Sequence, residues 1–333
     1  MEGMVRMKAG KLDSELLKEI VFKHIKLNRK EVLVRPAIGE DCAVVDFGEE
    51  ACVLSTDPIT GAVNEVGRLS VHISCNDIAS SGTEPIGIML TIMVPEGTTE
   101  EQIEEIMRQA SEEAERLNVE IIGGHTEITN AVNKTVIVST AIGKNQKEKL
   151  VKKSPVKPGD AIILTKYAGL EGTGIIATDY IDKLKQHLTN DELNRAKDML
   201  NQLSVVKEGV IAGKAGALEM HDVTEGGVLG AVWEICERTG SGARIDYDKI
   251  PITKETLKIC QIFGLDCLRL ISSGCMMMVV SGEKTQEVLS ALHQEQIPAS
   301  QIGVVTEKGR YMLKDGLEIE IQPPASDELY KVL

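Results

Sequence analysis

Apolar positions in the first half of the chain recur with the periods of helices and strands. An apolar stripe over Ser14–Ile25 predicts an amphipathic helix, and a second helix is predicted over Arg68–Ser81. The clearest helix begins at a predicted capping box of Thr98 with Glu101, and its apolar face runs from Ile103 to Leu117. Strands are predicted at 43–47 and 51–55, which form a hairpin, and at 86–94, 120–122 and 135–142.

A stretch rich in turn-forming residues, Ser154–Asp160, divides the chain and precedes a fresh predicted strand at 161–165. We therefore expect two domains, 1–153 and 154–333, which is the natural division for 333 residues. Both halves mix helices and strands, so the fold class is α/β or α+β. In the second half, helices are predicted near 191–203, 205–215 and 228–238, and strands near 276–280, 303–305 and 317–321.

Composition narrows the function. Hydrophobic residues make up 42% and charged residues 26%, a balance typical of a soluble globular protein. The formal charge of −14 argues against binding to nucleic acid or to an anionic membrane surface. The chain shows no signal peptide and no run of 18 apolar residues, and its seven cysteines never form a C-x-x-C pair. A cytoplasmic protein with reduced cysteines in its core is expected.

The common nucleotide-binding motifs are absent. Gly209–Lys214 is too short for a Walker A loop, and Gly169–Gly174 does not match the dinucleotide pattern. An acidic protein that binds ATP must neutralise its phosphates locally, and Mg²⁺ held by carboxylates does this. Acidic or glycine-rich clusters lie at predicted strand and helix ends. In the first half they are Gly39-Glu40-Asp41-Cys42-Ala43, Thr56-Asp57, Asn76-Asp77-Ile78-Ala79 and Gly123-Gly124-His125-Thr126-Glu127.

Each of these clusters also has a purely structural interpretation. Asp41 and Asp57 could cap turns, Asp77 could be a solvated helix residue, and the glycine pair could be a plain turn. As a set they are more informative, because carboxylates from separate strand ends can converge on one hard cation.

A fifth cluster, His221-Asp222-Val223-Thr224-Glu225-Gly226-Gly227, leads into an apolar helix. Its glycines suit an anion site at a helix N-terminus, and the structural alternative is a helix cap.

The ordered set of motifs resembles the superfamily of aminoimidazole ribonucleotide (AIR) synthase. That superfamily includes the hydrogenase-maturation factor HypE, thiamine-monophosphate kinase, selenophosphate synthetase and the amidotransferase FGAM synthetase. The resemblance covers nearly the whole chain and is strongest to HypE. The motifs that carry it are Gly39-Glu40-Asp41, Thr56-Asp57, Asn76-Asp77-Ile78-Ala79-x-x-Gly82-x-x-Pro85, Gly123-Gly124-x-Thr126 and His221-Asp222-x-Thr224-x-Gly226-Gly227.

The resemblance implies a homodimer whose N-terminal domains form a shared β-barrel, with ATP and Mg²⁺ bound beside it and the C-terminal domain closing the cleft. It implies an ATP-dependent enzyme that phosphorylates an amide or carbonyl oxygen of a small or protein-bound substrate, and possible partner proteins of a maturation complex. Metal and phosphate handling falls to Asp41, Asp57 and Asp77. Further nucleotide contacts fall to Gly39, Thr56, Asn76, Gly123, Gly124, Thr126 and Glu127, and substrate-side roles to His221, Asp222 and Thr224. His221 is also a candidate proton shuttle near neutral pH.

Three departures from the HypE pattern stand out. HypE proteins end in a cysteine that carries the carboxamide, whereas this sequence ends at Leu333 and its last cysteine is Cys275. The acidic position after the glycine pair is His125, for which Glu127 is a candidate replacement. Glu225 stands where HypE members are basic, which would alter the substrate pocket.

Two alternatives to a HypE-like enzyme stay open. One is a small-molecule kinase resembling thiamine-monophosphate kinase, which shares the Thr-Asp and Asn/Ser-Asp-x-Ala features. The other is a nucleotide-binding maturation subunit that no longer catalyses, against which the three retained aspartates argue. AIR synthase itself fits less well because Asp57–Gly61 replaces its phosphate loop, and selenophosphate synthetase lacks support because no N-terminal catalytic cysteine is present.

Overall fold

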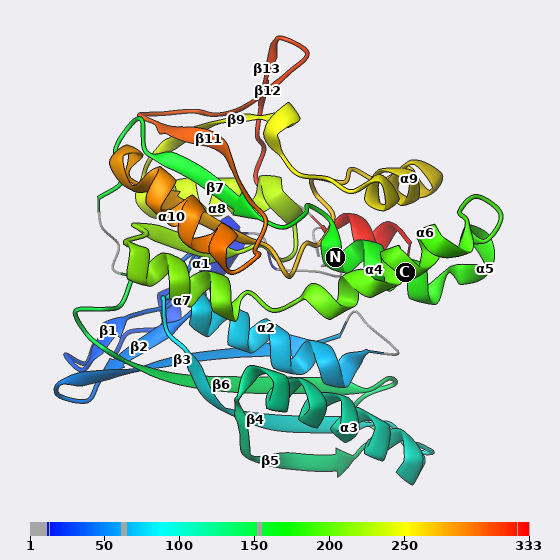
Figure 1. Cartoon of the computed structure of the whole chain (residues 1–333). Coiled ribbons are helices and arrows are strands. Elements are labelled where there is room, and N and C mark those ends of the chain that lie inside the picture. Colours follow the sequence, from blue (N-terminus) through cyan, green and yellow to red (C-terminus); the bar gives the residue numbers. More distant parts are fainter. Residues whose placement is uncertain (1–11, 13, 61–64, 152–154, 325, 333) are drawn as a thin grey trace, which may run out of the picture.

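The computed structural model describes residues 12, 14–60, 65–151, 155–324 and 326–332. Two mixed layers of sheet and helix are stacked on each other in Figure 1: the lower one holds strands β1 to β6 with α2 and α3, and the upper one holds the elements from β7 onward together with α1. This confirms the predicted two-part α/β architecture. The expected boundary at 153/154 lies outside the described residues and stays a prediction. Among the helices of the described residues, none combines the length and the apolar character needed to cross a membrane.

The N-terminal sheet has six strands in the order β1-β2-β3-β6-β4-β5. All neighbouring pairs are antiparallel except β4 with β5, which is parallel. The sheet is open, with β1 and β5 as its edges, so the described part of one chain does not close a barrel. The strands are β1 (Val32–Val34), β2 (Ala43–Asp46), β3 (Glu50–Ile59), β4 (Pro85–Val94), β5 (Glu120–Ile128) and β6 (Val136–Gln146).

Helices α2 (Val66–Ser80) and α3 (Glu100–Leu117) pack against each other beside this sheet. Most of α2 is buried, because the sheet covers one side and helix α7 (Val206–Ala215) of the second half covers another. Gly209 of α7 allows this close approach, since a Cβ atom there would lie 2.1 Å from the carbonyl oxygen of Ala79. The two halves are therefore packed backbone to backbone next to Asp77.

The C-terminal sheet has seven strands in the order β13-β12-β9-β11-β7-β10-β8, antiparallel except for the pair β9 and β12. Its central strands β7 (Ala161–Thr165) and β10 (Met276–Val280) are buried along their whole length. The other strands are β8 (Glu219–Asp222), β9 (Gly242–Asp246), β11 (Ala299–Thr306), β12 (Arg310–Lys314) and β13 (Leu317–Glu320). The helices are α4 (Leu170–Asp179), α5 (Ile181–Leu184), α6 (Asn190–Asp198), α8 (Gly227–Thr239), α9 (Lys254–Phe263) and α10 (Thr285–Gln294).

Several predicted elements are corrected. The first helix, α1, covers only Ser14–Ile20 and is followed by the 3-10 turn η1 (Phe22–His24). The capping box of α3 is formed by Thr99 with Gln102, one residue later than predicted. The adjacent threonines made the sequence pattern ambiguous by one position. The remaining 3-10 turns are η2 (Met199–Gln202), η3 (Tyr247–Lys249), η4 (Gly282–Lys284) and η5 (Glu328–Lys331).

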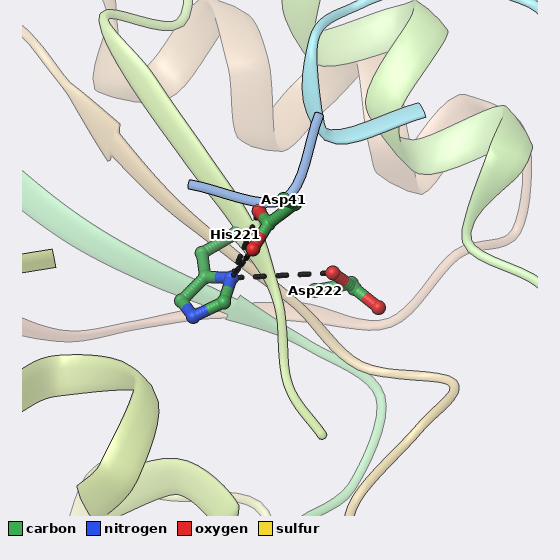
Figure 2. Close-up of side chains that lie close together, drawn as sticks. All are labelled: Asp41, His221 and Asp222. Atoms are coloured by element: carbon green, nitrogen blue, oxygen red, sulfur yellow. Dashed lines mark hydrogen bonds and ion pairs between the residues drawn. The ribbon is translucent and has the colours of Figure 1, made fainter. Parts of the chain in front are cut away.

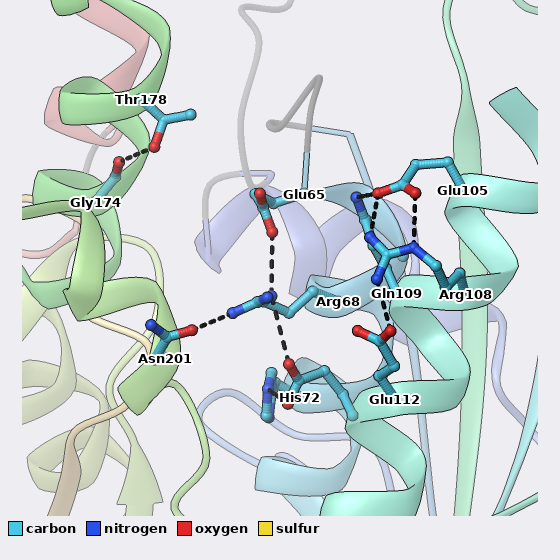
Figure 3. A network of polar contacts seen from close by, with 12 residues as sticks. Glu65, Arg68, His72, Glu105, Arg108, Gln109, Glu112, Gly174, Thr178 and Asn201 are labelled. Carbon is cyan, nitrogen blue, oxygen red and sulfur yellow. Dashed lines mark hydrogen bonds and ion pairs between the residues drawn. The ribbon is translucent and has the colours of Figure 1, made fainter. Parts of the chain in front are cut away.

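A polar network also joins the two halves (Figure 3). Arg68 of α2 lies 3.1 Å from the carboxylate of Glu65 and 3.5 Å from that of Glu113, and it donates a hydrogen bond to Asn201 in η2. His72 lies 3.2 Å from Glu113, and burial lowers its pKa despite that carboxylate. Arg68 thereby links α2, α3 and the second half of the chain.

Candidate functional site

A cavity of about 570 Å³ is lined by residues from both halves of the chain. Five aspartates line it; one is Asp327 near the end of the chain, and the other four lie in the motifs that the sequence singled out. Asp41 precedes β2, Asp57 lies within β3, Asp77 lies on α2, and Asp222 ends β8. The structure thus brings together the three predicted metal-site aspartates and adds Asp222, which was expected on the substrate side.

The charges of Asp41, Asp57 and Asp222 all act on Asp77. The Ser55 hydroxyl donates a hydrogen bond to Asp77 and lies 3.2 Å from Asp57. Burial raises the pKa of Asp77 well above its usual range, and the neighbouring charges of Asp222 and Asp57 raise it further. Burial together with Asp41 raises the pKa of Asp222 to about 7. A concentration of negative charge of this kind favours the binding of a cation.

His221 lies next to two of these aspartates, Asp41 and Asp222 (Figure 2). Its Nδ1 lies 3.0 Å from Asp41, and its Nε2 lies 2.8 Å from Glu234 of α8. Burial alone would lower the pKa of His221, but the two carboxylates reverse this and raise it to about 10. At neutral pH the ring is therefore an imidazolium that donates from both nitrogens. In this state it holds Asp41 in place. The role of His221 as a proton shuttle stays a prediction.

Arg238 of α8 fixes the loop that carries Asp41. Its buried guanidinium donates hydrogen bonds to the carbonyl oxygens of Gly39 and Met220, and it lies 3.3 Å from the carboxylate of Glu219. Gly39 adopts φ +73°, and a Cβ atom there would lie 3.0 Å from a backbone oxygen of Glu234. Gly39 lies outside the cavity lining and shapes the approach to Asp41.

Thr56 and Thr224 line the cavity, whereas Asn76 does not. The Asn76 side chain is buried, donating to the carbonyl of Leu203 and accepting from the N–H of Val205. Asn76 therefore joins α2 to the second half of the chain.

The glycines at the start of α8, Gly226 and Gly227, serve close packing. The N–H of Gly226 donates to Asp327 and that of Gly227 to the carbonyl of Thr224. A Cβ atom at Gly227 would lie 2.5 Å from the carbonyl oxygen of Leu268. Both N–H groups are thus occupied by protein acceptors, which differs from the anion site that the sequence suggested.

The glycine pair Gly123-Gly124 does not reach the cavity of its own chain. It lies inside β5, which continues to Ile128 and forms an edge of the N-terminal sheet. A Cβ atom at Gly124 would lie 2.0 Å from the carbonyl oxygen of Leu90, so glycine permits the pairing of β5 with β4. His125, Thr126 and Glu127 are exposed on this edge, and the His125 ring lies 3.5 Å from Glu127.

Sequence reasoning assigned no role to several residues that line the cavity. Glu171 lies in the first turn of α4, within the glycine-rich stretch that failed to match a nucleotide motif. Asp327 and Tyr330 come from the last described segment of the chain. No local pattern marks these positions, because only the tertiary fold brings α4 and the last segment to the aspartates.

The fold and the site define a two-domain α/β protein with an acidic cavity between its halves, and comparison with known proteins identifies its family. Residues 39–144 match the model of the N-terminal domain of AIR synthase related proteins, and residues 157–316 match that of the C-terminal domain. The chain belongs to the AIR synthase-related family. This confirms the family that the ordered set of motifs predicted.

The relatives include proteins of hydrogenase maturation. A protein of Methanocaldococcus jannaschii named for hydrogenase expression and formation is 30% identical over 86% of this chain and 84% of its own length. The carbamoyl dehydratase HypE of Rhizobium leguminosarum is 28% identical over 83% of this chain and 79% of its own. A thiamine-monophosphate kinase of Methanospirillum hungatei is also 28% identical, over 86% of this chain and 94% of its own length.

Solved structures share the fold. HypE in a complex with HypF has a TM-score of 0.74 at 21% identity and covers 92% of this chain and 99% of that one. HypE in complex with ATP has a TM-score of 0.72 at 20% identity, and the match covers 96% of this chain and 97% of that one. At this level of identity the likeness establishes the fold.

Proposed function

We propose that this protein is a HypE-like enzyme that binds ATP with Mg²⁺ and activates an amide or carbonyl oxygen of its substrate by phosphorylation. The observation that carries the proposal is the convergence of Asp41, Asp57, Asp77 and Asp222 in one cavity between the domains. Relatives named carbamoyl dehydratase and a homologous fold solved with ATP support the same chemistry.

The donor set of the cavity fits Mg²⁺. Magnesium prefers oxygen ligands and is usually held by one or two carboxylates together with substrate phosphates. Oδ2 of Asp222 is buried without a hydrogen-bond partner, so a ligand position is available. Ligand atoms of Asp41, His221 and Asp222 also lie within 4.8 Å of one another, although a charged His221 would act as a positioning group and leave the carboxylates as ligands. Mg²⁺ would neutralise the phosphates that the acidic cavity otherwise repels.

The protein's own residues would provide positioning and charge. His221 and Arg238 hold Asp41 from the C-terminal half, while Ser55 holds Asp77 beside Asp57. Closing the cavity between the halves would then bring the γ-phosphate and the substrate oxygen together, which is the main contribution an enzyme makes to phosphoryl transfer.

A homodimer is part of the proposal. Apolar side chains are exposed on β4 and β5: Ile86, Met89, Ile122 and Ile128 are 39–57% exposed. Pairing of two open sheets would cover these side chains and the β5 edge. The predicted nucleotide residues Gly123, Gly124, Thr126 and Glu127 lie on this edge, away from the cavity of their own chain. They would serve a nucleotide site only across such an interface.

The seven cysteines bear on the HypE likeness. All are free, and six are buried, with Cys52 partly buried. Burial raises the pKa of each thiol. None of them can act as a mobile carrier thiol, so we propose a separate amide or carbonyl substrate, either a small molecule or a group on a partner of a maturation complex. Reduced thiols also suit a cytoplasmic location.

The experiment is a measurement of ATP turnover by the purified protein with Mg²⁺, in the presence of a panel of carboxamides and, separately, of thiamine monophosphate. The proposal expects phosphate release that depends on Mg²⁺ and is stimulated by a carboxamide. Stimulation by thiamine monophosphate alone would transfer the assignment to the kinase alternative. Binding of ATP without turnover on any substrate would favour the non-catalytic subunit.

A further inference from the structure

The stretch that leads from the end of α1 to β1, residues 20–30, is basic in an otherwise acidic protein. The whole chain has 51 acidic and 37 basic residues, yet this basic segment has four basic side chains and no acidic one. The four are Lys23, Lys26, Arg29 and Lys30, and all are exposed. Among the described residues, only Arg29 of these four has a carboxylate within ion-pair distance, that of Glu31 at 3.1 Å. The other three charges face solvent and are available to a partner.

The basic segment also exposes apolar side chains. Leu27 is 83% exposed, the highest value among the exposed large apolar side chains of the described residues, and Ile25 is 52% exposed. The backbone of Ile25 is extended, and residues 25–29 form neither helix nor strand. Side chains two positions apart on an extended chain point to the same face. Ile25 and Leu27 therefore suit two neighbouring pockets of a groove, with Lys26 on the opposite face.

The backbone of the basic segment is open to hydrogen bonding, while both of its ends are held. Within the described part of the chain, the N–H groups of residues 26–28 donate to no acceptor. On one side, Lys18 of α1 lies 3.4 Å from Glu237 of α8, and on the other side β1 pairs with β2. Extended segments with free N–H groups bind as an added strand or in a groove. Fixed ends lower the entropy that such binding costs.

The basic segment lies away from the surfaces already assigned. It leads into β1, and β1 and β5 are the two edges of the six-stranded sheet, so the proposed dimer edge is the other one (Figure 1). None of its residues lines the acidic cavity. A partner bound to this segment would therefore compete neither with dimer formation through β5 nor with a ligand in the cavity.

Charge and apolar content together define the kind of partner. A nucleic acid would meet the cations but leave Leu27 uncovered, and the net charge of −14 repels a polyanion as large as a duplex. The same net charge repels an anionic membrane, and a few apolar side chains anchor a protein only weakly to lipid. A protein groove with apolar pockets and carboxylates on its rim satisfies the lysines, the apolar side chains and the N–H groups at once.

We propose that the basic segment is a docking segment for a partner protein and that it binds, as an extended chain, in an apolar groove with an acidic rim. Ile25 and Leu27 fill the pockets of the groove, and Lys26 and Lys30 pair with the carboxylates of its rim. The N–H groups of residues 26–28 donate to its backbone carbonyls. This inference is independent of the proposed function, because it concerns a surface outside the cavity.

The test uses a short fluorescein-labelled peptide of alternating leucine and glutamate, which presents the chemistry of such a groove. Its binding to the full-length protein at low ionic strength is measured by fluorescence anisotropy. We expect it to bind about fivefold tighter than a peptide of alternating serine and glutamate. Lys26→Glu combined with Lys30→Glu should weaken binding by about tenfold, and Leu27→Ser by about threefold. Lys207→Glu combined with Lys214→Glu, which makes the same charge change at two exposed lysines of α7, is the matched control and should leave binding unchanged.

Amide hydrogen exchange shows where the peptide binds, and we expect exchange at residues 26–28 to become slower in its presence. Unchanged affinity in the Lys26→Glu, Lys30→Glu protein, or equal affinity for the serine and glutamate peptide, would overturn the proposal. Phosphatidylserine vesicles and a DNA duplex are tested in parallel. Tighter binding of either than of the peptide, lost in the same double variant, would assign the segment to a membrane or to nucleic acid instead. A larger oligomer at low ionic strength that the double variant loses would assign it to a second copy of the chain.

Discussion

At the scale of single residues, the site is organised around buried charge. Asp41, a residue of the first half, is held by His221 and Arg238 of the second half. The imidazolium of His221 is the positive charge that faces both Asp41 and Glu234. A buried pair of this kind is costly to break, because removing one partner leaves the other charge uncompensated.

His221→Asn should therefore lower the free energy of unfolding by roughly 3–5 kcal/mol, since two buried carboxylates lose their shared partner. Urea denaturation at neutral pH measures the change. His187→Asn is the matched control, because His187 is exposed and should change stability by less than about 0.5 kcal/mol. Equal effects of the two substitutions would show that His221 carries no structural charge.

Glu171 predicts a pH dependence with a definite sign. Its pKa rises from 4.5 to about 7 on folding, so the folded state binds the proton more tightly than the unfolded state. Its contribution to stability is fully present below pH 4.5 and is lost as the pH rises through about 7. Glu171→Gln removes that loss, so relative to the unmodified protein it should gain on the order of 3 kcal/mol between pH 5 and pH 8. Denaturant titrations at both pH values test this, and a pH-independent difference would contradict it.

The sequence predicted part of the site at this scale. Asp41, Asp57 and Asp77 stood out because acidic residues at element ends are suited to a hard cation, and the structure brings them into one cavity. Their role as metal ligands stays a prediction. Glu171 and Asp327 could not be found in this way, because their proximity to the aspartates depends on how α4 and the last segment pack.

At the scale of elements, strand β5 and helix α2 have features that local sequence patterns do not predict. A glycine pair usually interrupts a strand, yet β5 runs through Gly123 and Gly124. At Gly124 the paired residue Leu90 leaves no room for a side chain. Helix α2 was predicted, but its burial on most sides could not be, because it results from α7 packing against it.

Gly209→Ala tests that packing. A methyl group there would overlap the Ala79 backbone, so α7 and α2 must separate, and stability should fall by about 1–3 kcal/mol. Gly230→Ala in α8 is the matched control, because its nearest neighbour would be 3.5 Å away and alanine is the better helix former. Thermal unfolding of both variants gives the comparison. If Gly209→Ala were as stable as the control, this would contradict the tight contact between α7 and α2.

At the scale of the whole molecule, the open N-terminal sheet requires a partner in our account. Ile122→Lys places a charge among the exposed apolar side chains of β4 and β5 and should convert the dimer to a monomer. Sedimentation velocity across a range of concentrations measures this. Leu317→Lys, at a 68% exposed position on β13 of the other sheet, serves as control and should leave the dimer intact. A monomer in the unmodified protein at all concentrations would contradict the proposed interface.

The central claim is that the four aspartates form a MgATP site, and calorimetric titration of ATP into the protein tests it most directly. We predict binding that requires Mg²⁺ and that weakens at least tenfold in Asp57→Asn, about 1.4 kcal/mol. Asp182→Asn, on a side chain that is 97% exposed, should bind as the unmodified protein does. Without nucleotide, the Asp57→Asn protein should be at least as stable as the unmodified protein, because the substitution removes one charge that repels Asp77. Binding that is independent of Mg²⁺, or unchanged in Asp57→Asn, would contradict the account.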